Sequence, residues 1–217
     1  MRLTIKQITI ITMILSISLL LLGINVKATE EYNFTPEQKE YLLKKKEEDK
    51  KNADAIAKKY FRENPVKNAT MFRSASYGGR LGTYGDILIT YNGGKKSLLH
   101  GHAGIVSLDN SVTIEAFPWQ GVVRKSNRWY EKGNRLYRPK NVSVSQYRAA
   151  ARNAQSHVGK EYFLDIFNKW RTDKFYCSQL VWRAWLDAGK NIAPSSGNIV
   201  TPGDLEKDAT RLIQIVR

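Results

Sequence analysis

The sequence predicts an α+β protein in which a curved antiparallel sheet packs against an amphipathic helix, with a helical extension at the N-terminus. Short apolar runs separated by turn residues occupy the middle of the chain, as in an antiparallel sheet. Two stretches with apolar residues at helical spacing follow these runs. A charge-rich stretch with a helix-start signal precedes the runs. A length of 217 residues, 42% of them hydrophobic, suits one sizeable globular domain plus a short extension.

Residues 1–28 have the features of an export signal. Arg2 and Lys6 give a positive beginning, residues 8–24 are almost unbroken apolar sequence, and small side chains precede a cleavage point after Ala28. We therefore expect a secreted, extracellular protein. The alternative is an uncleaved membrane anchor, because the apolar run approaches the ~18 residues that begin to span a bilayer. No cysteine lies near the cleavage point, which excludes a lipoprotein.

The expected exported chain is strongly basic. Residues 1–28 hold three of the 35 Lys and Arg residues and none of the 20 Asp and Glu residues, which leaves 32 basic residues, 20 acidic residues and a net charge of +12. This charge favours an anionic wall polymer or membrane surface as a partner, although solubility alone is the simpler reason for it. No finger spacing or RNA-binding aromatic pattern is present, so no nucleic-acid partner is expected.

Residues 29–70 are expected to form the charged helical extension. Thr35 and Pro36 are typical of a helix start, with Gln38 completing a capping box, and the helix is expected to continue to about Arg62. Its second half carries an apolar stripe, formed by Ala53, Ile56, Ala57 and Tyr60. The stripe predicts that this half docks on another part of the molecule.

Residues 71–217 are expected to form the main domain. Strands are predicted at residues 87–91, 103–108, 112–117, 122–124 and 135–138, with an edge strand at 212–216. Helices are predicted at residues 145–157 and 176–188. The histidines and the single cysteine do not fall at zinc spacing, and no phosphate-binding glycine pattern occurs. Neither a metal nor an organic cofactor is expected.

Cys177 is the only cysteine of the chain, so it cannot form an internal disulfide. It is a buried small hydrophobe, an intermolecular link or a reactive thiol. Its place in the first turn of an amphipathic helix favours the reactive thiol. The positive end of a helix stabilises a thiolate, and the amides of the first turn stabilise an oxyanion on a substrate.

The pairing of two strands predicts a base and an orienting group for this thiol. If the loop around residues 109–110 has an even length, Gly104 pairs with Glu115, and His102 then lies on the same face as the glutamate. His102 and Glu115 become diagonal neighbours, and Gly104 leaves room for the carboxylate to turn toward the imidazole. A charged residue in an apolar strand is costly unless it is paired, which also favours this contact. An odd-length loop would put Glu115 on the other face.

The other two histidines have separate interpretations. His100 has the same strand parity as His102 and is the rival base. His157 ends an alanine-rich helix and is expected to be a cation that caps the helix C-terminus.

The order of these motifs resembles a known family. The motifs are Gly85-Asp86-Ile87-Leu88, Gly101-His102-Ala103-Gly104-Ile105-Val106, Ile114-Glu115-Ala116 and Tyr176-Cys177-Ser178-Gln179-Leu180-Val181. Together they resemble the circularly permuted papain-like hydrolases of the YiiX/YycO group within the NlpC/P60 superfamily, in which the histidine strand precedes the cysteine helix. The resemblance covers about residues 71–217 and leaves the N-terminal helix outside it.

The resemblance implies a papain-like fold in permuted order and a Cys–His–Glu triad, with Cys177 as nucleophile, His102 as general base and Glu115 as orienting group. It also implies that Tyr176 lines the substrate cleft, for which packing beside the helix is the alternative. The implied activity is that of a cysteine amidase or endopeptidase on cell-wall peptides. Relatives with this order include lipid acyltransferases, so a lipid amide or ester is the second substrate.

A non-catalytic module that binds the wall or a membrane is the alternative from another class. The net charge of +12 and the basic helix favour it. The reactivity of Cys177 toward iodoacetamide separates this alternative from an enzyme, because a buried structural thiol is inert.

Overall fold

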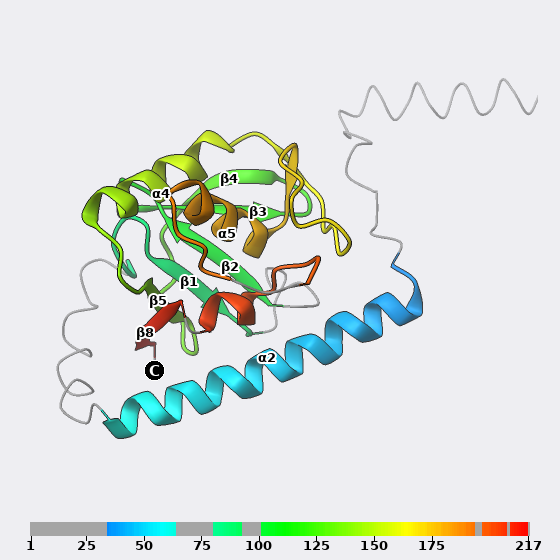
Figure 1. The fold of residues 1–217 in the computed structure, drawn as a ribbon, viewed down its shortest axis with the longest axis horizontal. Helices are drawn as coiled ribbons and strands as arrows, with labels where there is room; N and C mark the ends of the chain where they lie inside the picture. Colours follow the sequence, from blue (N-terminus) through cyan, green and yellow to red (C-terminus); the bar gives the residue numbers. More distant parts are fainter. Residues whose placement is uncertain (1–33, 64–79, 93–100, 194–196, 208, 217) are drawn as a thin grey trace, which may run out of the picture. The chain divides into compact units, whose positions relative to one another are not determined.

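The structure is a computed structural model that describes residues 34–63, 80–92, 101–193, 197–207 and 209–216. Its centre is a six-stranded antiparallel sheet in the order β4-β3-β2-β1-β5-β8 (Figure 1). The strands are β1 (Ile87–Thr90), β2 (His102–Val106), β3 (Val112–Phe117), β4 (Gly121–Ser126), β5 (Arg135–Pro139) and β8 (Thr210–Ile215). All six lie within a few residues of the predicted positions, and β8 is an edge strand as expected.

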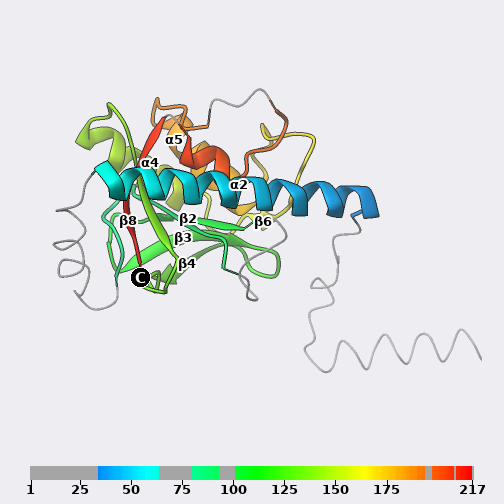
Figure 2. The ribbon, with the colours of Figure 1, turned by 90° about the horizontal axis from the view of Figure 1, so that it is seen from below.

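Two helices cover the sheet. They are α4 (Val144–Ser156) and α5 (Cys177–Asp187), and both views show them on the same face of the sheet (Figure 1 and Figure 2). The apolar side of α5 is fully buried and packs against β2, β3 and α4. The predicted α+β arrangement, with an antiparallel sheet against the cysteine-bearing helix, is therefore confirmed. A further buried cluster completes the core, formed by Leu81, Leu88, Val106, Trp129, Leu136 and Val216.

The N-terminal helix α2 (Pro36–Glu63) begins directly after Thr35, as the capping signal predicts. Its apolar residues Ala53 and Ala57 are buried, which confirms that the second half of the helix is docked. Two acidic residues of α2 contact the domain. Asp54 pairs with Arg135 of β5, and Asp49 lies so close to Gly203 that a Cβ at that glycine would overlap the carboxylate.

The structure contains three short elements that the sequence does not predict. Strands β6 (Glu161–Tyr162) and β7 (Lys174–Phe175) pair in parallel, and η2 (Pro202–Glu206) is a 3₁₀ helix capped by Thr201. A two-residue strand has no measurable alternation of apolar and polar residues, so its sequence carries no strand signal. These elements fix the segments on either side of α5.

Several predictions concern residues outside the described ranges. These are the export signal at residues 1–28, its cleavage point, the domain boundary at residue 70 and His100. Within the described ranges, none of the helices combines the length and the apolar character needed to cross a membrane.

Candidate active site

The hairpin of β2 and β3 has the predicted register, with Gly104 opposite Glu115. His102 and Glu115 therefore lie on the same face of the sheet. His102 Nε2 is 2.8 Å from Glu115 Oε2, and both side chains are buried. A Cβ at Gly104 would lie only 3.0 Å from Glu115 Cγ, so this glycine leaves the room that the carboxylate needs.

The Glu115 carboxylate accepts hydrogen bonds from three side chains. His102 binds one oxygen, while the Thr113 hydroxyl and the Trp129 indole nitrogen donate to the other, the latter at 3.1 Å. Burial alone raises the pKa of Glu115, but the hydrogen bonds from His102, Thr113 and Trp129 and the charge of His102 hold it below its usual range. Glu115 is therefore a buried carboxylate that stays charged.

The His102 imidazole is held by stacking as well as by Glu115. Its ring stacks on Phe117 at 4.7 Å and on Trp129 at 5.6 Å between ring centroids. Burial alone lowers the pKa of His102, but the neighbouring Cys177 thiol and the hydrogen bond and charge of Glu115 raise it to about 9. Glu115 occupies Nε2, and Nδ1 is buried without a hydrogen-bond partner in the described part of the chain, so Nδ1 is the nitrogen that remains for the thiol. The surroundings thus favour the protonated imidazolium form of His102.

Cys177 is the first residue of α5, with Tyr176 as its N-cap, and its side chain is buried. It lies where the sequence predicts, at the positive end of the helix. His102 is the first residue of β2. The helix that begins at Cys177 therefore packs against the strand that begins at His102, and the thiol raises the pKa of the imidazole.

Tyr176 has the contacts of a packing residue. Its side chain is buried, and its hydroxyl accepts a hydrogen bond of 2.9 Å from the backbone amide of Val200. Burial raises the pKa of this phenol well above its usual range. A direct role of Tyr176 toward a substrate stays a prediction.

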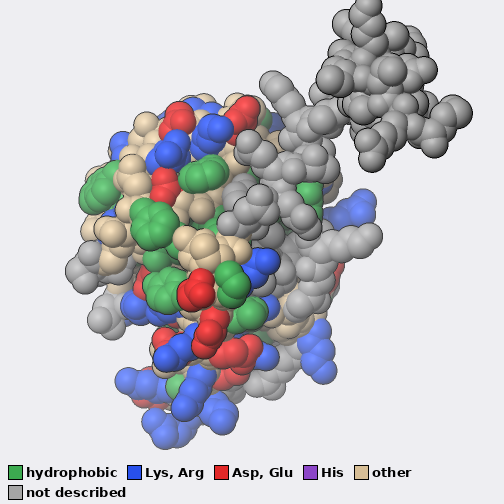
Figure 3. All heavy atoms as spheres, turned by 90° about the vertical axis from the view of Figure 1, so that its right-hand side faces the viewer, with side chains coloured by type: hydrophobic (Ala, Val, Ile, Leu, Met, Phe, Trp, Pro, Cys, Tyr) green, Lys and Arg blue, Asp and Glu red, His purple; other side chains and the backbone are tan. Residues whose placement is uncertain are grey.

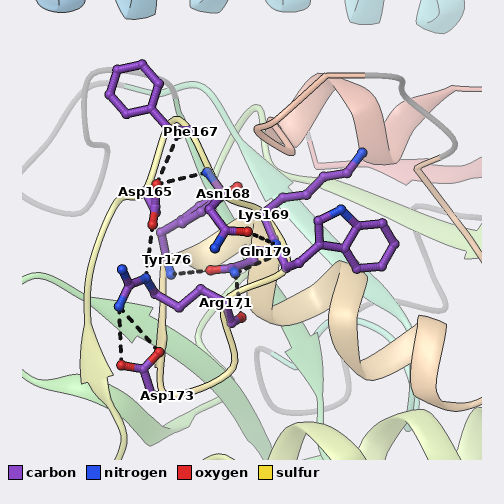
Figure 4. A network of polar contacts seen from close by, with 9 residues as sticks. Asp165, Phe167, Asn168, Lys169, Arg171, Asp173, Tyr176 and Gln179 are labelled. Carbon is purple, nitrogen blue, oxygen red and sulfur yellow. Dashed lines mark hydrogen bonds and ion pairs between the residues drawn. The ribbon is translucent and has the colours of Figure 1, made fainter.

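A loop between β6 and β7 is fastened to the first turn of α5 (Figure 4). The Gln179 side chain donates to the carbonyl oxygens of Lys169 and Arg171, both at 2.9 Å, and its oxygen accepts from the Tyr176 amide. Asp165 accepts hydrogen bonds from the amides of the loop and from Arg171. Gln179 follows Cys177 by two residues, so the same turn that carries the thiol also holds this loop.

The prediction for His157 is wrong. Its ring is tilted against that of Phe175, with the ring centroids 4.4 Å apart, and both ring nitrogens are buried without a hydrogen-bond partner in the described part of the chain. Burial and the charge of Lys160 lower its pKa to about 4. The side chain is therefore a neutral packing group, and only its backbone amide caps α4. The rival base His100 lies outside the described residues.

The sequence-based prediction does not include the residues that surround His102 and Glu115. Thr113 has the same parity as Glu115 along β3, so strand alternation contains a signal for it. Trp129 lies in a loop whose path no local pattern predicts. It is the residue that both stacks on His102 and donates to Glu115.

No protein-family model and no curated protein matches the chain. Among solved structures, the chain is similar to one described as the crystal structure of metalloprotein yiiX from Escherichia coli O157:H7, DUF1105. The two share 18% sequence identity, with a TM-score of 0.48, over 61% of this chain and 97% of that chain. Within the described ranges of this chain, no three His, Cys, Asp or Glu residues are grouped so that they could hold a metal ion.

Proposed function

We propose that this protein is an exported cysteine hydrolase that cleaves an amide bond, with peptides of the cell wall as the substrate. Cys177 is the nucleophile, His102 the general base and acid, and Glu115 the group that orients the imidazole. The observation that carries the proposal is the buried contact of His102 with Glu115, on a strand against which the helix that begins at Cys177 packs. A nucleophile, a base and an orienting group in this relation are what covalent catalysis of acyl transfer requires.

The contacts also support this division of roles. A structural cysteine needs only an apolar pocket, whereas Cys177 interacts with a histidine whose other nitrogen is held by a carboxylate. Glu115 is kept charged by its donors, so it fixes the ring and stabilises the imidazolium.

The reaction follows from these positions. The Cys177 thiolate attacks the carbonyl carbon, a C–S bond forms, and the helix N-terminus faces the developing oxyanion. The C–N bond then breaks as the His102 imidazolium gives its proton to the leaving amine. In the second half, neutral His102 takes a proton from water, the resulting hydroxide attacks the thioester, and the Cys177 thiolate leaves. The products are a carboxylic acid and an amine, and the protein returns to its starting state.

Incubation with peptidoglycan fragments, followed by mass spectrometry of the products, tests the proposal. We expect the protein to release fragments whose summed mass equals that of the substrate plus one water, and the Cys177→Ala variant to release none. Cys177→Ser is the matched control for the size of the side chain. Product formation by Cys177→Ala at the rate of the unchanged protein would contradict the proposal.

Exposed aromatic side chains favour a lipid amide or ester as the second candidate substrate. Phe167 and Trp170 are 69% and 59% exposed on the loop that Gln179 fastens to α5. Figure 3 shows hydrophobic side chains exposed between charged ones on one face of the molecule. Aromatic side chains of this kind suit an interface between water and lipid. The same mass-spectrometric assay with lipid amides tests this candidate, and a Phe167→Ala/Trp170→Ala variant should then lose lipid turnover but retain cleavage of short soluble peptides.

A further inference from the structure

A cavity of about 730 Å³ opens at a place that the proposed reaction does not use. Its lining includes Asp86, which precedes β1, and Arg138 and Lys140, at and beyond the end of β5. The Asp86 carbonyl accepts a hydrogen bond from the amide of Val106, the last residue of β2. His102 is the first residue of that strand, so the two sites are roughly 13 Å apart along β2, at about 3.3 Å per residue. The cavity is therefore separate from Cys177.

One arginine of this cavity is held in a fixed orientation. Arg138 donates to both oxygens of the fully buried Asp86 carboxylate, from Nε at 2.8 Å and from Nη2 at 2.9 Å. Asp86 is itself held by the amide of Thr83 at 2.8 Å. A guanidinium has five N–H donors, so this pairing leaves three of them for another acceptor. The Arg138 side chain is one-third exposed, which lets a ligand reach those donors.

Two further cations line the same cavity. Lys140 and Arg211 are exposed, and within the described ranges neither forms an ion pair with an acidic side chain. The backbone brings them together, because the Lys140 amide donates to the carbonyl oxygen of Ala209, the residue before β8. Val144, the first residue of α4, also lines the cavity, and the first turn of that helix carries no acidic residue. The positive N-terminal end of α4 adds to the electrostatic field of the three cationic side chains.

We propose that this cavity binds the phosphate group of an anionic ligand, with Arg138, Lys140 and Arg211 as its contacts. Asp86 offsets the charge of only one of the three cations, so the lining keeps an excess of positive charge. Arg138 supplies donors in the planar arrangement that matches phosphate oxygens, and Lys140 and Arg211 supply charge from the rim. A phosphate in this cavity would hold the protein on a phosphate-bearing surface or substrate. The site does not depend on the hydrolase activity.

Binding of inorganic pyrophosphate, measured by calorimetry at low salt, tests the site. The test variant is Lys140→Ala/Arg211→Ala, which leaves the buried Asp86–Arg138 pair intact. The control is Lys132→Ala/Arg152→Ala, which removes the same charge at two exposed positions outside the cavity. We expect the affinity to fall by at least about tenfold in the test variant and by less than about twofold in the control. Cys177→Ala should bind as the unchanged protein does, which keeps this test apart from that of catalysis.

Sedimentation with vesicles of phosphatidylglycerol and phosphatidylcholine distinguishes the sources of the phosphate. Binding to these vesicles that depends on Lys140 and Arg211, without binding to pyrophosphate, assigns a lipid headgroup. Binding to pyrophosphate alone assigns a soluble phosphate. Equal weakening in the test and control variants would show general charge attraction and overturn the proposal. So would the absence of binding to both probes.

Discussion

Glu115 and Glu206 are buried to the same extent, each 4% exposed, yet they differ in charge. Glu115 accepts hydrogen bonds from three side chains, and its pKa is lowered. Neither carboxylate oxygen of Glu206 has a hydrogen-bond donor in the described part of the chain, and Arg135 Nη1 is 3.8 Å away. Burial and the neighbouring Asp49 raise the pKa of Glu206 to about 8, and the charge of Arg135 opposes this only in part.

The difference shows that donors, rather than exposure, decide the charge of a buried carboxylate. Glu115 is charged and can stabilise an imidazolium. Glu206 keeps its proton at neutral pH and lies where η2 faces the docked helix α2. In the proposed function the first arrangement serves chemistry at Cys177, and the second makes the stability of the fold depend on pH.

The largest expected effect is on catalytic activity, which should depend on the Glu115 carboxylate and not on the Glu206 carboxylate. Glu115→Gln should lower kcat/KM by about 10² to 10⁴-fold, because a neutral amide neither fixes the reactive tautomer of His102 nor stabilises its charge. Glu206→Gln should change kcat/KM by less than about twofold. Turnover of a peptidoglycan fragment measures both, and circular dichroism should show that both variants are folded. An equal loss of kcat/KM in the two variants would contradict the difference in role between Glu115 and Glu206.

The second effect is on stability. The folded protein keeps the Glu206 proton up to about pH 8, whereas the unfolded chain releases it near pH 4.5. The native state therefore binds more protons between these values, and the free energy of unfolding should fall as the pH rises, by about 1.4 kcal/mol per pH unit from this group. Urea unfolding at pH 5, 6, 7 and 8 should show this slope in the unchanged protein relative to Glu206→Gln. Parallel pH profiles of the two proteins would contradict it.

The third effect concerns the donors of Glu115. Thr113→Val has nearly the same shape but removes one hydrogen bond to the carboxylate. Loss of a bond to a charged group should cost about 1.5 to 3 kcal/mol of stability at pH 7 and raise the pKa of Glu115. The acid limb of the pH–rate profile should then move to higher pH. A profile that keeps its position would mean that Thr113 does not hold the charge.

The smallest effect concerns Tyr176. Tyr176→Phe removes the hydrogen bond from Val200 and should cost about 1 kcal/mol of stability, with KM unchanged if the residue only packs. A rise in KM without loss of stability would instead support the prediction that Tyr176 lines the cleft. Thermal unfolding and steady-state kinetics on the same preparation measure the two quantities.

The sequence predicts the hairpin and the contact of His102 with Glu115 because both follow from local rules. Alternation along a strand and an even loop place two side chains on one face, and no distant residue is needed. The position of Cys177 follows in the same way from the periodicity of its helix. These parts of the candidate site can therefore be predicted from the sequence.

Other parts depend on the path of the chain in space. Trp129 reaches Glu115 from an irregular segment, and Glu206 meets Asp49 only because α2 packs near η2. His157 is neutral because the fold buries it against Phe175, which overrides the expected attraction of a cation to the end of a helix. No periodic pattern contains this information.

Alkylation of Cys177 by iodoacetamide, followed by intact mass at pH about 6, tests the central claim most directly. A thiolate held beside an imidazolium should react faster in the folded protein than the same cysteine does after unfolding in urea, and His102→Ala should remove this advantage. A folded protein in which Cys177 stays unmodified while the unfolded chain reacts would contradict the account, because the thiol would then be only a buried packing group.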